Sequence, residues 1–132
     1  MSERGTITIW VLGLCVALLF LGGLGADFWH AIAVRRQLSA TADAAATAGA
    51  NGLDEHQLRA GTIKIDPARA RALADEVIAQ EAPRDASVSV DVAGNQVTVT
   101  LRARVPFTLL GIFMHGQDFA VRVRASAHPE ER

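Results

Sequence analysis

The sequence predicts an α+β protein in which a long N-terminal transmembrane helix, a second amphipathic helix and a small antiparallel sheet of about three strands follow one another. The residues from Gly5 to Ala26 form an apolar run, and no charged residue follows Arg4 before Asp27. Beyond this run, apolar residues recur at helical spacing without a proline as far as about residue 50. From Ser87 the period changes to two residues, which is typical of strands with one buried face.

The N-terminal run is long enough to cross a bilayer, which requires roughly 20 apolar residues in a helix. A helix that continues unbroken to residue 50 has about 45 residues and reaches roughly 65 Å, more than a bilayer needs. We therefore expect two parts, a transmembrane helix with its soluble continuation (1–50) and a small α+β head (51–132). One broad apolar face of the helix can include Phe28, Ile32, Leu38, Ala42, Ala45, Ala46 and Gly49, with Arg35, Arg36 and Asp43 away from it. The head is expected to pack on the alanine-rich part.

A cleaved secretory signal is the alternative interpretation of residues 1–26. Gly23 and Gly25 provide the small-x-small pattern of a cleavage site. However, Glu3 offsets Arg4, so the N-terminal region is barely basic, and the apolar run exceeds the usual core of about 7–15 residues. These features favour a retained anchor over a secreted protein.

The elements of the head can be placed by their boundary residues. Asn51-Gly52 should stop the first helix, because both residues tolerate the left-handed conformation of a C-cap. A short helical turn is expected around residues 55–59. Asp66-Pro67 then opens the second helix, with Asp as N-cap and Pro at the first helical position, and Pro83 ends it. Its apolar stripe comprises Ala70, Leu73, Ala74, Val77 and Ile78.

Two alternating runs flank Gly94-Asn95, a dipeptide that suits a two-residue hairpin loop. Pro106 closes the second strand, because proline cannot donate to a ladder. The hairpin register pairs Val92 with Val97, Val90 with Val99 and Val88 with Leu101, all on one face. A third run, with Phe119, Val121, Val123, Ala125 and Ala127, completes the sheet.

No pattern in the chain indicates catalysis or metal binding. The only cysteine, Cys15, lies in the apolar run, which excludes an intrachain disulfide and a cysteine-based metal site. Asp75 and Glu76 are neighbours on a helix and do not face each other, and there is no phosphate-binding glycine loop. We predict a non-enzymatic protein with no cofactor, metal or small-molecule substrate. The histidines His30, His56, His115 and His128 share no ligand spacing.

Two regions of the head are candidate partner surfaces. The first comprises Arg102, Arg104, Arg122 and Arg124, which share one face if their strands pair. This face is either a solvated surface that resists aggregation or a contact surface for a partner. The candidate partners are anionic lipid, an acidic protein and nucleic acid. Nucleic acid is the least favoured, because the face has no aromatic residues. The second is the apolar insert 107–114, either a contact surface or a plug for the core; its candidate residues are Phe107, Leu110, Ile112 and Phe113.

The helix offers its own assembly features. Gly13 with Ala17 and Gly22 with Ala26 have the small-xxx-small spacing of closely packed helices. Asp27 either ends the span as an interfacial polar residue or pairs with a charge on a neighbouring subunit. The expected partners are the lipid bilayer and other helices, in a homo- or hetero-oligomer.

One stretch resembles a known family. R-G-T-I-T-I-W-V-L-G, the apolar span and D-F-W-H-A-I-A-V-R-R-Q-L-S-A-T-A-D-A-A-A-T-A-G-A together resemble the start of TadE/TadG-like proteins, the short actinobacterial members above all. That family has Arg-Gly before the span, Asp after it, an Arg-rich turn and an alanine-rich signature. The matching residues are Arg4, Gly5, Asp27, Arg35, Arg36, Leu38, Ala42, Asp43, Ala45 and Ala46.

The resemblance implies a minor pilin-like or pilus-assembly component of a tight-adherence (Flp) secretion system. It also implies a single-pass protein of the cell membrane with a pilin-like helix, an extracytoplasmic head and other pilus subunits as partners. The fifth residue after Gly5 is Trp10, where peptidase-processed pseudopilins carry Glu, and this favours the anchored, TadG-like type. The alternative is a secreted effector or binding protein released by cleavage of residues 1–26.

Overall fold

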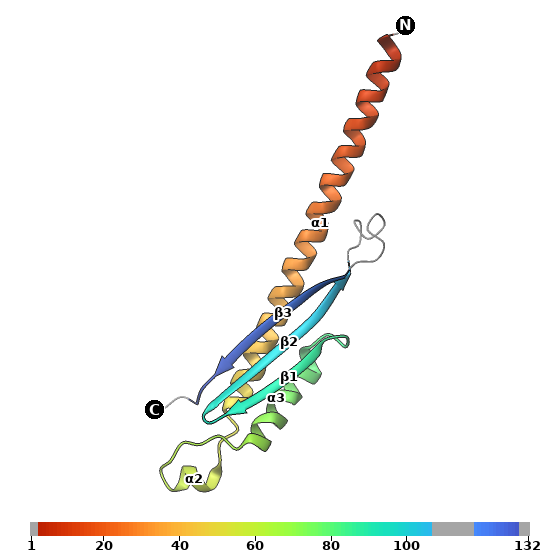
Figure 1. The fold of residues 1–132 in the computed structure, drawn as a ribbon. Helices are drawn as coiled ribbons and strands as arrows, with labels where there is room; N and C mark the ends of the chain where they lie inside the picture. Colours follow the sequence, from red (N-terminus) through yellow and green to blue (C-terminus); the bar gives the residue numbers. More distant parts are fainter. Residues whose placement is uncertain (1–2, 107–117, 130–132) are drawn as a thin grey trace. The chain divides into compact units, whose positions relative to one another are not determined.

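The computed structural model describes residues 3–106 and 118–129, and its elements confirm the predicted α+β fold with a three-stranded antiparallel sheet (Figure 1). Contacts divide the chain into two compact units. One contains α1 up to Ala33, and the other contains α1 from Val34 together with the shorter helices and most of the sheet. The elements are α1 (Glu3–Ala50), α2 (Glu55–Arg59), α3 (Pro67–Glu81), β1 (Ser87–Ala93), β2 (Gln96–Pro106) and β3 (Asp118–Ala127).

The hairpin register is the one the sequence predicts. β2 is the central strand, between β1 and β3, and β1 pairs with it antiparallel in the order Val92–Val97, Val90–Val99 and Val88–Leu101. Gly94 has a φ of 59°, which a glycine adopts at no steric cost and which the two-residue loop requires. Alternate residues of β2 are buried from Val97 to Val105, so one face of the sheet is the core face.

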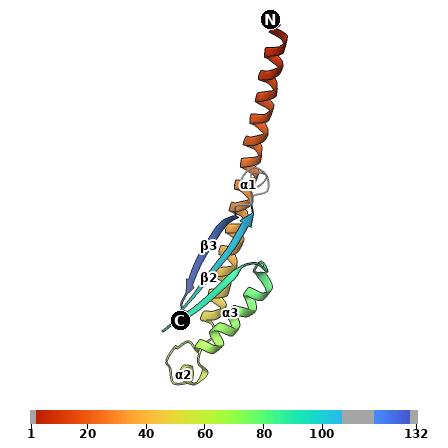
Figure 2. The same ribbon diagram turned by 45° about the vertical axis from the view of Figure 1, so that its right-hand side comes forward.

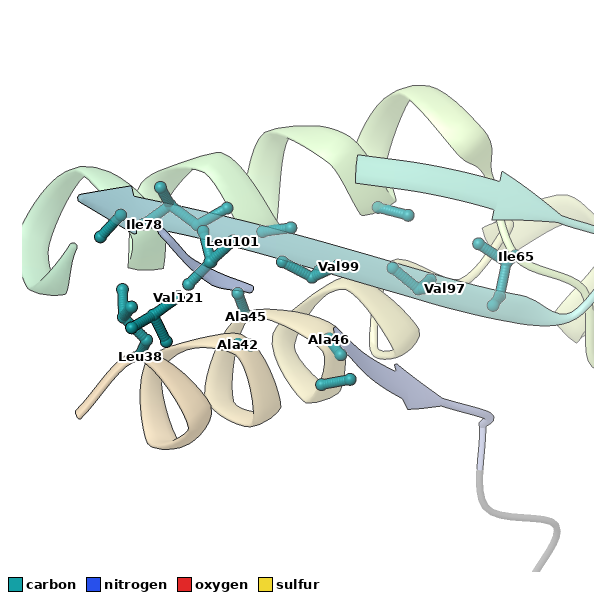
Figure 3. Close-up of a cluster of buried hydrophobic side chains, with 14 of the residues drawn as sticks. Leu38, Ala42, Ala45, Ala46, Ile65, Ile78, Val97, Val99, Leu101 and Val121 are labelled. Carbon is teal, nitrogen blue, oxygen red and sulfur yellow. The ribbon is translucent and has the colours of Figure 1, made fainter. Parts of the chain in front are cut away.

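The core lies between the alanine-rich part of α1 and the sheet (Figure 3). Leu38 of α1 and Val97, Val99 and Leu101 of β2 are fully buried. Figures 1 and 2 show the second half of α1 and the whole of α3 on the same side of the sheet. Small side chains on α1 allow its backbone to approach the strands closely, and the valines and Leu101 fill the space. The alanines are Ala42, Ala45, Ala46 and Ala50.

Asn95 does more than form the hairpin loop. Its side-chain Nδ2 donates to the Ile63 carbonyl oxygen at 2.8 Å, and its Oδ1 accepts from the Ile65 amide at 3.2 Å. Ile65 is itself buried and forms an isolated bridge with Leu53. The side chain therefore joins the segment between α2 and α3 to the tip of the β1–β2 hairpin, across about 30 residues of sequence.

The end of α1 corrects one expectation. The helix ends at Ala50 as predicted, but Gly52 is not left-handed; among the described glycines only Gly61 and Gly94 have positive φ. The helix end closes instead through the Gly52 amide, which donates to the Gly49 carbonyl oxygen at 2.9 Å. The reason for glycine here is space, because a Cβ on Gly52 would lie 2.7 Å from the Ala70 nitrogen.

Gly49 has the same role one turn earlier. A Cβ at this position would lie 2.9 Å from Val97 Cγ1 and 3.1 Å from the Ala70 carbonyl oxygen. The two glycines thus let the first turn of α3 lie against the end of α1.

Replacing Val99 by Asp is expected to unfold the head, because the carboxylate would be buried without a partner opposite Val90. The control is Ser89→Asp, on the exposed face of β1. The measurement is hydrogen exchange of the β2 amides in the detergent-solubilised full chain. Equal protection in the two variants would contradict the register.

Gly52→Ala is expected to destabilise the head by about 1–3 kcal/mol, since its new methyl group meets backbone that cannot rotate away. Gly25→Ala is the matched control, because nothing lies within 4 Å of a Cβ there. Exchange rates of the β2 amides again report the difference. A neutral Gly52→Ala would show that α3 can move away at no cost.

Candidate membrane stem and assembly surfaces

The first part of α1 exposes apolar side chains on every side. Trp10 and Leu19 are each 76 % exposed, and Leu24 is 53 % exposed. Transfer of one such side chain from water to an apolar environment is worth about 1.5–3 kcal/mol, so the segment requires lipid or other helices around it. Within the part of the chain that the structure describes, only α1 is long and apolar enough to cross a membrane, by length and composition.

The predicted packing residues of this segment lie on its open surface. At Gly13, Gly22 and Gly25 an added Cβ would meet nothing within 4 Å. Ala17 and Ala26 are also exposed. The two small-xxx-small pairs are therefore uncovered by the described residues of their own chain and can contact a neighbouring helix closely.

Asp27 occupies a different environment from the apolar residues around it. Its side chain is only 7 % exposed, whereas Phe28 and Trp29 beside it are about 70 % exposed. It interacts within its own chain. Pairing of Asp27 with a charge on a neighbouring subunit stays a prediction.

The alanine-rich part of α1 separates its residues into two sets. Leu38, Ala42, Ala45 and Ala46 are buried in the head core, which explains why small residues recur there. Arg35, Arg36 and Asp43 are exposed on the other side of the helix, as the periodicity predicts. Arg4 and Gly5 lie in the first turn of α1.

The structure brings the four predicted arginines to one face of the sheet. Arg102, Arg104, Arg122 and Arg124 are all exposed, and they alternate with buried residues on the neighbouring strands β2 and β3. The Thr98 and Ser126 hydroxyls lie 3.1 Å apart on the same face and form a hydrogen bond. The second predicted surface, with Phe107, Leu110, Ile112 and Phe113, lies outside the described residues.

One ion pair connects the two short helices. Arg69 of α3 donates to the Glu55 carboxylate of α2, and this hydrogen bond and the positive charge lower the pKa of Glu55. The same contact raises the pKa of Arg69. Each helix is also capped by an aspartate, Asp54 or Asp66, whose carboxylate accepts from two backbone amides.

Because the folded-state pKa of Glu55 is lowered, its stabilising effect is present above the unfolded-state pKa and is lost as the pH falls through the folded value. Glu55→Gln should therefore lower the melting temperature of the head slightly at neutral pH and not at all in acid below the folded-state pKa. The pair is exposed, so a large effect is not expected. A difference between the two proteins that grows on acidification would contradict this assignment.

The described residues contain no group of three or more His, Cys, Asp or Glu side chains arranged to hold a metal ion. The surfaces that the structure does define are the apolar first part of α1, the alanine face of its second part, on which the sheet packs, and the arginine face of the sheet.

Comparison with protein families gives a match over α1. Residues 5–52 match the family described as "Putative Flp pilus-assembly TadE/G-like". The chain carries a TadE/G-like segment. The match ends two residues beyond α1, and it confirms the resemblance that the sequence motifs predict. Comparisons with curated proteins and with solved structures give no significant match.

The TadE/G-like family implies a role in Flp pilus assembly. A pilus-assembly family implies contact with other pilus subunits and with the membrane, and it is not a class of enzymes. In this chain the TadE/G-like segment includes both the apolar first part of α1 and its alanine-rich second part, which packs against the sheet.

Proposed function

We propose that this chain is a membrane-anchored, minor pilin-like component of a tight-adherence (Flp) secretion system, with its head outside the cytoplasm. The observation that carries the proposal is the coincidence of the TadE/G-like match, 5–52, with the continuous helix α1, Glu3–Ala50. The protein acts through assembly and not through catalysis. We further propose a division into a stem, 1–50, and a head, 51–132.

The exposed surface of α1 supports the anchor. A helix that is apolar on all sides belongs either in a protein core or in a membrane, and the described residues leave almost all of this span uncovered. Helix–helix packing in lipid depends on small residues, because lipid and side chains are equally apolar there. The open glycines Gly13, Gly22 and Gly25 therefore support contact with the stems of other subunits.

The head supports a structural role in a second way. The head shares one core with the second half of α1, because side chains of α3 and the sheet pack there against that part of the helix. In this arrangement the residues Arg35, Arg36 and Asp43 are exposed and available to neighbouring subunits.

The orientation is tested by fusing alkaline phosphatase after Arg132, and the enzyme is expected to be active because it folds outside the cytoplasm. The exposed Arg35 and Arg36 follow the span, and the positive-inside rule weakly favours the opposite orientation, so the experiment is decisive. A fluorescent cytoplasmic reporter at the same position is the control. An inactive phosphatase together with a fluorescent reporter would overturn the proposed orientation.

N-terminal sequencing of the mature protein from fractionated cells separates the anchor from its alternative. A protein in the membrane fraction that begins at Met1 or Ser2 supports the retained stem. A protein in the medium that begins near Ala26 would support the secreted effector or binding protein and overturn the anchor.

A further inference from the structure

The outward face of the sheet carries an excess of positive charge. Arg102, Arg104, Arg122 and Arg124 lie on it, and none of the four forms an ion pair with the described residues. The carboxylates of Asp91, within β1, and Asp118, at the start of β3, are exposed on the same face, but they form no ion pair with these arginines either. Four arginines against two aspartates leave this face net positive.

Next to Arg102 the face is hollowed. The depression has a volume of about 280 Å³ and is lined by Ser87, Val88, Ser89, Thr100 and Arg102. The register places Ser87 opposite Arg102 and Ser89 opposite Thr100, so hydroxyls from both strands surround it. The Ser87 hydroxyl donates only a long bond, 3.5 Å, to the Arg102 carbonyl oxygen. Guanidinium and hydroxyl groups are the donors that bind phosphate oxygens in proteins.

The composition of the face distinguishes between kinds of partner. Protein interfaces usually contain aromatic or methionine side chains at their centre, and single-stranded nucleic acid is bound by stacking on aromatic rings. The described residues of this face include no aromatic or methionine side chain. A phosphate surface can be bound without them, by positively charged groups and hydrogen-bond donors alone. The described residues of the face are Ser87, Ser89, Asp91, Ala93, Gln96, Thr98, Thr100, Arg102, Arg104, Pro106, Asp118, Ala120, Arg122, Arg124 and Ser126.

We propose that the arginine face of the sheet, centred on Arg102 and Arg122, binds the phosphate groups of anionic phospholipids at a membrane surface. The proposal rests on the proposed function, because a membrane-anchored chain works beside such a surface. The depression beside Arg102, with a volume of about 280 Å³, has room for one phosphate group next to the guanidinium and the hydroxyls. The remaining arginines act through their charge.

The test uses the full chain held soluble in a non-ionic amphipathic polymer, which shields α1 and prevents the stem from inserting. Co-sedimentation with vesicles of phosphatidylglycerol is compared with vesicles of phosphatidylcholine. The wild type is expected to bind the anionic vesicles only, and binding should weaken as salt is added. Anchoring is scored separately by cell fractionation, so failure of the stem and failure of the arginine face give different results.

The variant Arg102→Ser/Arg122→Ser is expected to bind the anionic vesicles about 30-fold more weakly, because each basic residue near an anionic surface contributes somewhat less than about tenfold to the affinity. The charge-matched control is Arg59→Ser/Arg71→Ser, whose arginines are exposed on α2 and α3 and which should bind like the wild type. Arg102→Lys/Arg122→Lys should keep binding within about threefold, because a bilayer responds to charge. Hydrogen exchange of β2 verifies that each variant is folded.

Four results would overturn the proposal. The first is equal binding to the two kinds of vesicle, and the second is an equal loss in the two serine variants. The third is tighter binding of poly-glutamate than of anionic vesicles, which would identify an acidic polypeptide as the partner. The fourth is that inorganic phosphate, at matched ionic strength, competes for the site as well as the vesicles do. This would identify a site for free phosphate and contradict membrane binding.

Discussion

The head depends on the contact between the alanine face of α1 and the central strand β2. Ala42, Ala45 and Ala46 present almost no side chain, so the strand approaches the helix closely enough for Val97 and Val99 to become fully buried. The same closeness admits α3, whose first turn fits against Gly49 and Gly52 where any Cβ would collide. A larger residue at any of these positions would separate three elements at once, because interiors are close-packed and do not absorb extra volume freely.

This constraint explains the mixed character of α1. Its first part is apolar on all sides and its second part has one small apolar face with charges opposite, although the backbone is one continuous helix. The two parts therefore differ in what covers them. The described residues leave the first part almost entirely uncovered, whereas the second part packs against the chain's own sheet. The alanine-rich signature of the TadE/G-like segment gains a physical meaning here, since its buried members are the residues that pack the head.

The two faces of the sheet carry different kinds of side chain. The inner face is aliphatic and is covered by two helices, whereas the outer face carries arginine and hydroxyl side chains and is uncovered by the described residues. Such a face discourages sheet-to-sheet association, and its unpaired charges also make it the head's best-defined surface for an anionic partner. The family match does not reach these strands, so the arginine face is a property of this chain that the match leaves undescribed.

Local patterns in the sequence determined the elements and the register. The apolar run and helical spacing predicted α1, Asp66-Pro67 predicted the start of α3, and Gly94-Asn95 with alternating valines predicted the hairpin pairing residue by residue. These signals lie within a few residues of each other, where steric and hydrogen-bonding preferences act directly. The outward position of the four arginines followed from the same alternation.

Only the tertiary structure decided what depends on residues far apart in the chain. From the local sequence, Gly52 is predicted to stop the helix. Only the folded structure shows that a side chain at this position would collide with the backbone of Ala70. From the local sequence, Asn95 is predicted to be a turn residue. Its hydrogen bonds to Ile63 and Ile65 form only because the fold brings the segment between α2 and α3 to the hairpin. The depression beside Arg102 likewise needs two strands in register. Sequence patterns encode periodicity and local conformation, but close approach between distant segments is set by the packing of the whole core.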